Sequence, residues 1–354
     1  MFMKDIFSGK AAVQGRGLKI GRFGRFSAAV SSLCLVLVLL TGLVISCGKS
    51  GKQTESGNEK EVGKTFSRLR IAEQYGLAYA PLQIMRRKGY LEEELPDLEI
   101  SWQRLGNTAA IREAMLAGRT DIGFMGIPPF LIGYDRGMGW KIFTGLSEAP
   151  LGLVTWKSDI RGIEDFGPED RIALPQPGSI QHILLSMACE RELGRADVLD
   201  DILITANHPD GMQALLNRRE ISAHFTSPPY LMEELSEPDM RMILSGREAM
   251  GGEFTFIVGV ANEELYHSHP DAPAGIIRAL QRAEGFLREQ PFDAASILAE
   301  EYGISPEKTA EYLGWEGLRY SRNLAGIESF IHFMFTREYI KTEYRMEEVV
   351  YTPE

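Results

Sequence analysis

Small and hydrogen-bonding residues stand where predicted strands end and helices begin. A β-type run gives way to a helical pattern at Gly106-Asn107-Thr108 and again at Pro177-Gly178-Ser179. Backbone N–H groups at a helix start carry partial positive charge, so these positions favour carboxylate, sulfonate, nitrate or phosphate groups. Taken singly, Asn107, Thr108 and Ser179 are also typical helix caps. Their shared location, at the edge where open α/β sheets bind ligands, is what indicates a binding site.

Three of the six histidines, His182, His208 and His224, lie at the same kind of position. A metal site would need three or four converging ligands, which these residues could supply in a closed cleft. We expect each of them to make single hydrogen bonds instead, and we predict neither a metal nor a cofactor. The other histidines are expected to be ordinary surface or core residues; they are His267, His269 and His332.

The elements that would position these residues alternate along the chain. The predicted strands cover residues 69–73, 98–105, 121–125, 151–156, 171–174, 202–206, 221–225 and 254–260. The predicted helices cover residues 81–88, 107–117, 179–193 and 209–217, with two more opening at 128 and 228 and four beyond Pro270 at 272–288, 291–301, 306–315 and 324–339. Strands that alternate with helices predict an α/β fold with parallel pairing.

Part of this pattern occurs twice. Six positions between Ala114 and Leu131 carry the same residue type 100 positions later, between Ala214 and Leu231. In both copies a helix, a strand and a helix that opens with Pro-Pro follow in the same order. We interpret the repetition as two similar α/β lobes.

A β-type run on each side of the second copy predicts that one lobe is inserted into the other. The expected boundaries are 67–157 and 250–354 for the first lobe and 158–249 for the second. Two linking segments form a hinge, and a hinge implies a cleft between the lobes.

The first residues have the order of a secretory signal. Residues 1–46 carry six Lys or Arg against one acid, Asp5, and an apolar run from Ala28 to Ile45 ends at Ser46-Cys47. This end resembles the lipobox of bacterial lipoproteins, which implies cleavage before Cys47 and a lipid anchor on its sulfur. We therefore expect a signal peptide over 1–46 and a flexible tether over 47–66. A single transmembrane helix or a plain signal peptide would be the alternatives.

Charge and cysteine content narrow the class of protein. The net charge of −11 argues against non-specific binding of nucleic acid, which needs a basic surface. Of the three cysteines, Cys34 lies in the apolar run, so Cys189 would be the one free thiol of a mature chain acylated at Cys47. Neither an internal disulfide nor a structural zinc site is expected.

The order of several short motifs resembles the substrate-binding proteins of ABC importers in the nitrate/sulfonate/taurine group, which includes binders of thiamine-precursor pyrimidines and riboflavin. The matching motifs are Tyr79-Ala80-Pro81, residues 116–123 (LAGRTDIG), Pro177-Gly178-Ser179 and residues 223–230 (AHFTSPPY). The resemblance covers roughly residues 69–340. It implies a two-lobe type II periplasmic-binding-protein fold, in which a hinge closes the interlobe cleft on a small solute.

The same resemblance implies a set of ligand contacts from both lobes. In the first lobe these are Tyr75, Gly76, Tyr79, Asn107, Thr108, Gly126 and Ile127; in the second they are Ser179, Ile180, Gln181, His182, His208, Asp210, His224 and Ser227. The two tyrosines could stack on a planar ligand. Because Ile127 stands where a hydroxyl would suit an oxyanion, the expected ligand is a small organic anion or planar heterocycle rather than bare nitrate.

The implied protein is a monomeric, non-enzymatic receptor, lipid-anchored to the cell membrane on the periplasmic or outer side, which serves an ABC permease and its ATPase. One alternative is an enzyme similar to the pyrimidine synthases that share this fold. Those enzymes use a cysteine-rich iron motif, which this sequence lacks, and no Walker loop or G-x-S-x-G elbow is present either. The other alternative is a sensory lipoprotein that passes its bound state to a protein other than a permease.

Overall fold

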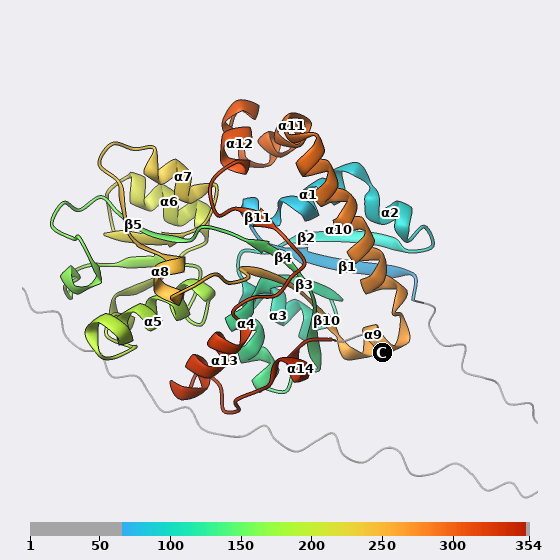
Figure 1. Cartoon of the computed structure of the whole chain (residues 1–354), viewed down its shortest axis with the longest axis horizontal. Helices are drawn as coiled ribbons and strands as arrows, with labels where there is room; N and C mark the ends of the chain where they lie inside the picture. Colours follow the sequence, from blue (N-terminus) through green and yellow to red (C-terminus); the bar gives the residue numbers. More distant parts are fainter. Residues whose placement is uncertain (1–65, 352–354) are drawn as a thin grey trace, which may run out of the picture. The chain divides into compact units, whose positions relative to one another are not determined.

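The computed structural model describes residues 66–351, which form two α/β lobes, each built on its own sheet (Figure 1). The first sheet has the strand order β11-β4-β10-β3-β1-β2 and the second has the order β7-β6-β8-β5-β9. The strands of the first sheet are β1 (Arg68–Glu73), β2 (Glu99–Arg104), β3 (Ile122–Gly126), β4 (Trp140–Glu148), β10 (Ile257–Asn262) and β11 (Arg319–Tyr320). Those of the second are β5 (Gly152–Thr155), β6 (Ile172–Leu174), β7 (Leu203–Thr205), β8 (Ala223–Thr226) and β9 (Arg241–Ser245).

The two sheets repeat one topology, which confirms the repeat predicted from the sequence. In the first sheet Ile71 is paired in parallel with Trp102 on one side and with Ile122 on the other. In the second sheet Ile172, 101 residues later, is paired in parallel with Leu203 and Ala223. The prediction of parallel pairing holds for these three strands of each sheet. It is wrong for β4, β10 and β11 and for β5 and β9, which pair antiparallel.

Helices cover both faces of each sheet (Figure 1). On the first sheet α1, α2, α10 and α11 pack together on one face, whereas α3, α4 and α13 lie on the other. On the second sheet α6 packs with α7, and α5 packs with α8 on the opposite face. The helices of the first lobe are α1 (Ala80–Lys88), α2 (Tyr90–Glu94), α3 (Thr108–Leu116), α4 (Ile127–Asp135), α9 (Glu263–Ser268), α10 (Asp271–Glu289), α11 (Pro291–Tyr302), α12 (Pro306–Leu313), α13 (Ile327–Thr336) and α14 (Met346–Val349). Those of the second are α5 (Ile180–Leu193), α6 (His208–Leu216), α7 (Tyr230–Leu235) and α8 (Gly246–Met250).

The chain passes between the lobes at two places that lie side by side. It enters the second lobe between β4 and β5 and leaves it between α8 and β10, and the Gly246 N–H donates to the Leu151 carbonyl at 2.7 Å. Because β5 pairs with β8 and β9, the predicted boundary at 157 is wrong, and the first lobe ends before Gly152. The predicted strand over 254–260 begins only at Ile257, since Phe254 and Phe256 belong to the connection and are buried there.

A third segment runs along this connection. The Arg322 carbonyl accepts from the Gly145 N–H at 3.1 Å, and the Thr255 hydroxyl exchanges hydrogen bonds with the Asn323 carbonyl and the Ala325 N–H. The connection between the lobes is therefore supported by backbone from the C-terminal part of the chain.

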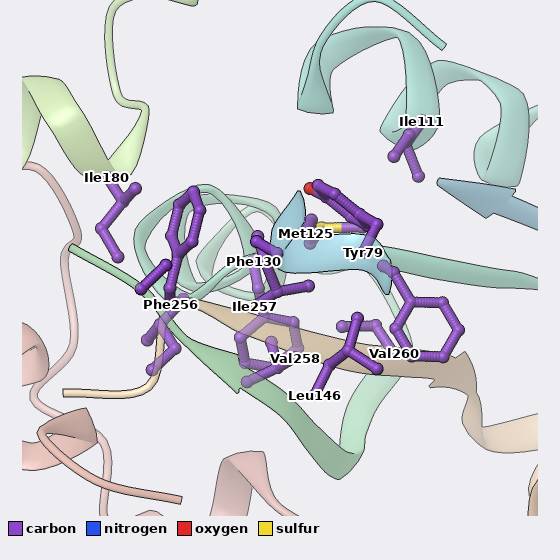
Figure 2. Close-up of a cluster of buried hydrophobic side chains, with 14 of the residues drawn as sticks. Tyr79, Ile111, Met125, Phe130, Leu146, Ile180, Phe256, Ile257, Val258 and Val260 are labelled. Carbon is purple, nitrogen blue, oxygen red and sulfur yellow. The ribbon is translucent and has the colours of Figure 1, made fainter. Parts of the chain in front are cut away.

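The hydrophobic core continues from the first lobe into the second. All five residues of β3 are buried, as expected for a central strand. Figure 2 shows the part of the core around β10, where Phe256 and Ile257 lie between first-lobe residues such as Phe130 and the side chain of Ile180 on α5. The lobes thus meet through apolar contacts as well as polar ones.

No helix within residues 66–351 is long and apolar enough to cross a bilayer. The same residues contain no group of three or more His, Cys, Asp or Glu side chains placed to hold a metal ion. Cys189 is a buried free thiol, and burial raises its pKa to about 12. The predicted signal peptide, Cys47 and the tether up to residue 65 lie outside the described residues; Phe66, predicted as the last tether residue, stacks on His269.

Candidate functional site

A small cavity of about 30 Å³ lies between the lobes. A cavity of this size has room for only about two water molecules. The cavity is lined by Gln74, Tyr75, Tyr79, Thr108, Gly126, Pro129, Pro175, Gln176, Ser179, Ile180, Gln181, His208, Phe256 and Ile257. Both lobes contribute, so a solute held here would touch both.

Four helices begin at this cavity, two from each lobe. Thr108 and His208 are the first residues of α3 and α6, and Gly126 and Ser179 are the N-cap residues of α4 and α5. Helix starts leave N–H groups without intrahelical partners and concentrate partial positive charge. No Asp, Glu, Lys or Arg of the described chain lines the cavity. Its electrostatic preference therefore comes from helix ends and neutral dipoles.

Side-chain amides connect the helix start of α3 to both lobes. Gln74, directly after β1, donates from Nε2 to the Thr108 hydroxyl at 3.1 Å. The Ala109 N–H donates to Oε1 of Gln176, in the second lobe, at 3.1 Å. The next N–H, that of Ala110, is capped by the Asn107 side chain at 3.0 Å. One of the N–H groups at the start of α3 therefore finds its hydrogen-bond acceptor in the opposite lobe.

His208 lines the cavity as a neutral ring. Its Nδ1 lies 3.2 Å from the Thr226 hydroxyl, and its Nε2 lies 3.3 Å from Nε2 of Gln181. Burial lowers the pKa of His208 to about 3, and the neighbouring His224 contributes to this shift. The Tyr230 ring stacks on it with 5.8 Å between ring centroids. The imidazole is therefore a fixed, uncharged hydrogen-bonding group.

Behind His208 lies a fully buried pair formed by His224 and Glu234. His224 Nδ1 is 2.6 Å from Glu234 Oε1, and neither side chain is exposed. Burial lowers the pKa of His224 to about 3 and raises that of Glu234, so both shifts favour the uncharged pair, in which the Glu234 carboxyl donates to His224 Nδ1. Gly211 of α6 covers the other ring nitrogen, since a Cβ there would lie 2.5 Å from Nε2. His224 therefore supports the wall and does not line the cavity.

An aromatic and apolar wall faces these polar groups. Tyr79 is almost completely buried, and burial raises the pKa of its hydroxyl well above the usual value. The guanidinium of Arg104 lies 5.6 Å from the centre of the Tyr75 ring and forms ion pairs with Glu73 and Glu301. Tyr75 is thus backed by a fixed cation, and Phe256, Ile257 and Ile180 complete the apolar side.

The structure brings eight of the fifteen predicted contact residues to the cavity. They are Tyr75, Tyr79, Thr108, Gly126, Ser179, Ile180, Gln181 and His208. Whether they bind a ligand remains a prediction, but they converge from both lobes as expected.

The other seven predicted contacts do not line the cavity. Asn107 caps α3, and Asp210 lies in the first turn of α6, where its carboxylate accepts from the Asn207 side chain at 2.6 Å. His182 accepts from the Gly178 N–H at 2.9 Å and contacts Asp200, so it fixes the turn before α5. His224 belongs to the buried pair described above. The remaining three are Gly76, Ile127 and Ser227.

These three residues occupy the contact between the lobes or the core. Gly76 has φ of 117° and lies against Pro228, whose carbonyl accepts from the Leu77 N–H at 2.9 Å. A Cβ on Gly76 would lie 2.9 Å from that carbonyl oxygen, so glycine is required there. The Ser227 side chain is buried beside it. Ile127 is fully buried and does not line the cavity; Ile180, Phe256 and Ile257 supply its apolar surface.

Sequence reasoning missed six lining residues: Gln74, Pro129, Pro175, Gln176, Phe256 and Ile257. Gln74 and Gln176 follow the ends of β1 and β6, so the strand-end rule that singled out Tyr75 and Ser179 could have found them. Phe256 and Ile257 had no local signal, because the connection between the lobes brings them to the cavity.

Two further sets of polar contacts hold the lobes together. In the first, which we call the α12 clamp, Glu233 of α7 accepts from Lys308 and from the Tyr312 hydroxyl, each at 2.8 Å. In the second, the α13 clamp, Glu190 pairs with Arg337, and the Ser186 and Tyr339 hydroxyls are 3.0 Å apart. Each clamp joins a helix of the second lobe to the C-terminal part of the first.

Comparison with known proteins concerns the family and the fold. Residues 67–301 match the model of the NMT1-like family. No curated protein matched the sequence. Among solved structures, the alkanesulfonate-binding protein SsuA from Xanthomonas axonopodis pv. citri, bound to MOPS, superposes with a TM-score of 0.67 at 19% identity, covering 80% of this chain and 98% of that one.

Two further structures show the same fold. The periplasmic aliphatic sulphonate binding protein SsuA from Escherichia coli has a TM-score of 0.63 at 18% identity, covering 81% of this chain and 93% of that one. A Candida albicans protein described as exhibiting the generic periplasmic binding protein fold has a TM-score of 0.60 at 13% identity, covering 78% and 90%. The predicted two-lobe periplasmic-binding-protein fold is confirmed.

Proposed function

The chain belongs to the NMT1-like family, and on that premise we propose that it is the solute-binding receptor of an ABC importer. The observation that carries the proposal is the convergence of four helix starts, two from each lobe, on one interlobe cavity. A solute placed there bonds to both lobes at once and stabilises the closed form. The permease and its ATPase would recognise that form, so the receptor needs no chemistry of its own.

We propose a small organic anion or a planar heterocycle as the solute. Helix starts favour an anionic group such as a sulfonate, and the absence of charged side chains from the described lining leaves that role to them. The Tyr75 ring and the apolar wall of Phe256 and Ile257 suit an organic remainder. The structural relatives named as sulfonate-binding proteins support an anion of this class.

A solute of this kind needs the lobes to move apart. Ligand pockets in proteins usually measure about 300–1,000 Å³, whereas the present cavity holds about 30 Å³. The clamps and the contact between Leu77 and Pro228 must therefore loosen on entry, and the cavity must be larger than it is here when the lobes close around the ligand.

Thermal denaturation of the full-length chain in detergent, with and without candidate solutes, tests the proposal. The panel comprises ethanesulfonate, taurine, nitrate, pyrimidines and flavins, and we call the compound with the largest effect the reference ligand. At a concentration of 100 times Kd, binding adds about 2.7 kcal/mol to the free energy of unfolding, which corresponds to a rise in Tm of roughly 5 °C or more. If no compound of the panel raises the Tm, the result contradicts the proposed function.

We further propose that Cys47 carries a lipid that holds the receptor at the membrane. The basic leader, the apolar run and the polar segment after Cys47 support this. A sensory lipoprotein would share the anchor and the closing motion, and capture of the ligand-bound receptor by its own permease would distinguish the importer from the sensor.

A further inference from the structure

Gln176 makes the side-chain contact between the second lobe and the start of α3. Gln176 lies in the turn between β6 and α5, where the Ser179 N–H donates to the backbone carbonyl of Gln176 at 3.1 Å. The residue is 9% exposed and lines the cavity. The backbone of the turn is fixed further by the bond from Gly178 to His182. Gln176 is therefore a buried polar group held in place at the centre of the proposed site.

The orientation of the Gln176 amide is determined by its partner. Ala109 offers a backbone N–H, which can only donate, so the amide oxygen must face α3. The amide nitrogen then points the other way; it makes no hydrogen bond within residues 66–351 and keeps some accessible surface. Because Gln176 lines the cavity, this free donor is available to a solute placed there.

We propose that Gln176 is a specificity-determining residue that couples closure of the lobes to recognition of the solute. This inference rests on the proposed function. The amide oxygen bonds to the first lobe at Ala109, and the amide nitrogen donates to an acceptor atom of the solute. Because the amide is planar and rigid, the nitrogen is aimed correctly only while the oxygen is bonded to α3. The site therefore selects solutes that present a hydrogen-bond acceptor, and it selects them in the closed form.

Two other roles would use the same contact differently. If Gln176 only holds the lobes together, its nitrogen has no part in binding. If Gln176 occupies the place of a ligand oxygen at Ala109 and is displaced on binding, its removal should make binding tighter. The three roles predict different results for a pair of substitutions.

The first substitution is Gln176→Glu, which keeps the acceptor for Ala109 and removes the donor. A carboxylate at a helix start is stabilising, so the Tm of the ligand-free protein should rise by about 1–3 °C. Affinity for the reference ligand, with ethanesulfonate tried first, should fall by about tenfold or more because the donor is replaced by a negative charge.

The second substitution is Gln176→Met, which keeps the side-chain length and removes both polar atoms. Here the ligand-free Tm and the affinity should both fall. Gln181→Met is the matched control, because Gln181 lines the same cavity but bonds to His208 within its own lobe. Amide hydrogen exchange should show loss of protection at Ala109 in Gln176→Met but not in Gln181→Met, with Ala110 unchanged in both.

The results separate the roles. Opposite shifts of ligand-free Tm and affinity in Gln176→Glu support the coupling. If Gln176→Glu binds the ligand as tightly as wild type, Gln176 only holds the lobes together. If Gln176→Met binds more tightly, the Gln176 oxygen is displaced from Ala109 by the ligand. Either outcome overturns the inference while leaving the receptor function intact. If no compound of the panel binds to the wild-type protein, the proposed function is overturned, and this inference with it.

Discussion

Substitution of Glu233 by Gln tests how far the α12 clamp sets ligand affinity. Glu233 accepts two hydrogen bonds from the first lobe, at 2.8 Å from Lys308 and 2.8 Å from Tyr312. The bond from Lys308 to Glu233 raises the lysine pKa, and burial raises the pKa of Tyr312 to about 12, so neither partner ionises differently near neutral pH. The Glu233→Gln change keeps the shape of the side chain but removes its charge.

The expected loss follows from exposure and geometry. Side chains of Lys308 and Glu233 are 37% and 22% exposed, so the ion pair itself contributes little, and solvent screens part of the remainder. The new amide keeps one acceptor oxygen in place of two, so one of the two donors, Lys308 or Tyr312, loses its acceptor and the other bonds to an uncharged oxygen. Together these changes lower the stability of the closed form by about 1–2 kcal/mol. That range corresponds to a fall in affinity of about five- to thirtyfold if the ligand-free protein is mainly open.

Calorimetric titration with the reference ligand measures the affinity, and small-angle scattering of the ligand-free protein measures its radius of gyration. In wild-type protein, raising NaCl to about 0.5 M should weaken binding, and in Glu233→Gln this salt effect should be smaller. Glu99→Gln is the control, because Arg68 and Glu99 form an exposed pair within the first lobe. Equal affinity and equal salt dependence in wild type and Glu233→Gln would refute the reasoning.

Three further outcomes are expected. The pKa of His208 is about 3 in the folded chain against about 6.5 when unfolded, so the unfolded state binds the extra proton, and the free energy of unfolding falls by up to about 1.4 kcal/mol per pH unit as pH drops from 6.5 towards 3. Denaturation at several pH values in this range should show a smaller dependence of that free energy on pH for His208→Gln. An unchanged pH dependence would contradict the assignment. Gly126→Ala would place a Cβ 3.3 Å from the Cβ of Ile180 across the cleft, and a titration should show ligand binding weakened about fivefold. The Tm should fall little, because φ at Gly126 is −68°, which alanine adopts readily. A large fall in Tm with intact binding would point to damage within the first lobe. Cys47→Ser should move the protein from the membrane fraction to the soluble fraction of cells, whereas continued attachment would favour a spanning leader.

Local signals predicted the parts of the fold that depend on local chemistry. Asn107 and Ser179 cap α3 and α5 as their positions indicated, and each Pro-Pro pair stands where a helix opens. The strands β4 and β9 were not predicted, although they complete the two sheets. Their place follows from pairing with β10 and β5, which are distant in sequence, and no local pattern specifies such a partner.

The site was predicted at the level of strand ends but not at the level of side-chain direction. His224 and His208 both stand near the end of the second sheet, yet only His208 reaches the cavity. His224 lies inside β8, where its side chain faces α6 and contacts Glu234 of α7. His208 instead opens α6, and no local pattern tells which of the two rings reaches the cavity. Glu234, the partner of His224, lies one helix turn beyond any motif that marked the site.

The hydrogen bond between Leu151 and Gly246 gives the second lobe the character of a cassette. Since the Gly246 N–H donates to the Leu151 carbonyl at 2.7 Å, the two places where the chain crosses between the lobes lie side by side. The other attachments are non-covalent, among them the two clamps, the bond from Ala109 to Gln176 and the contact between Leu77 and Pro228. Such a segment can be exchanged for its counterpart from another family member without rerouting the rest of the chain. A chimera of this kind would carry half of a foreign binding surface on an unchanged first lobe, and would provide a way to trace solute preference to one half or the other.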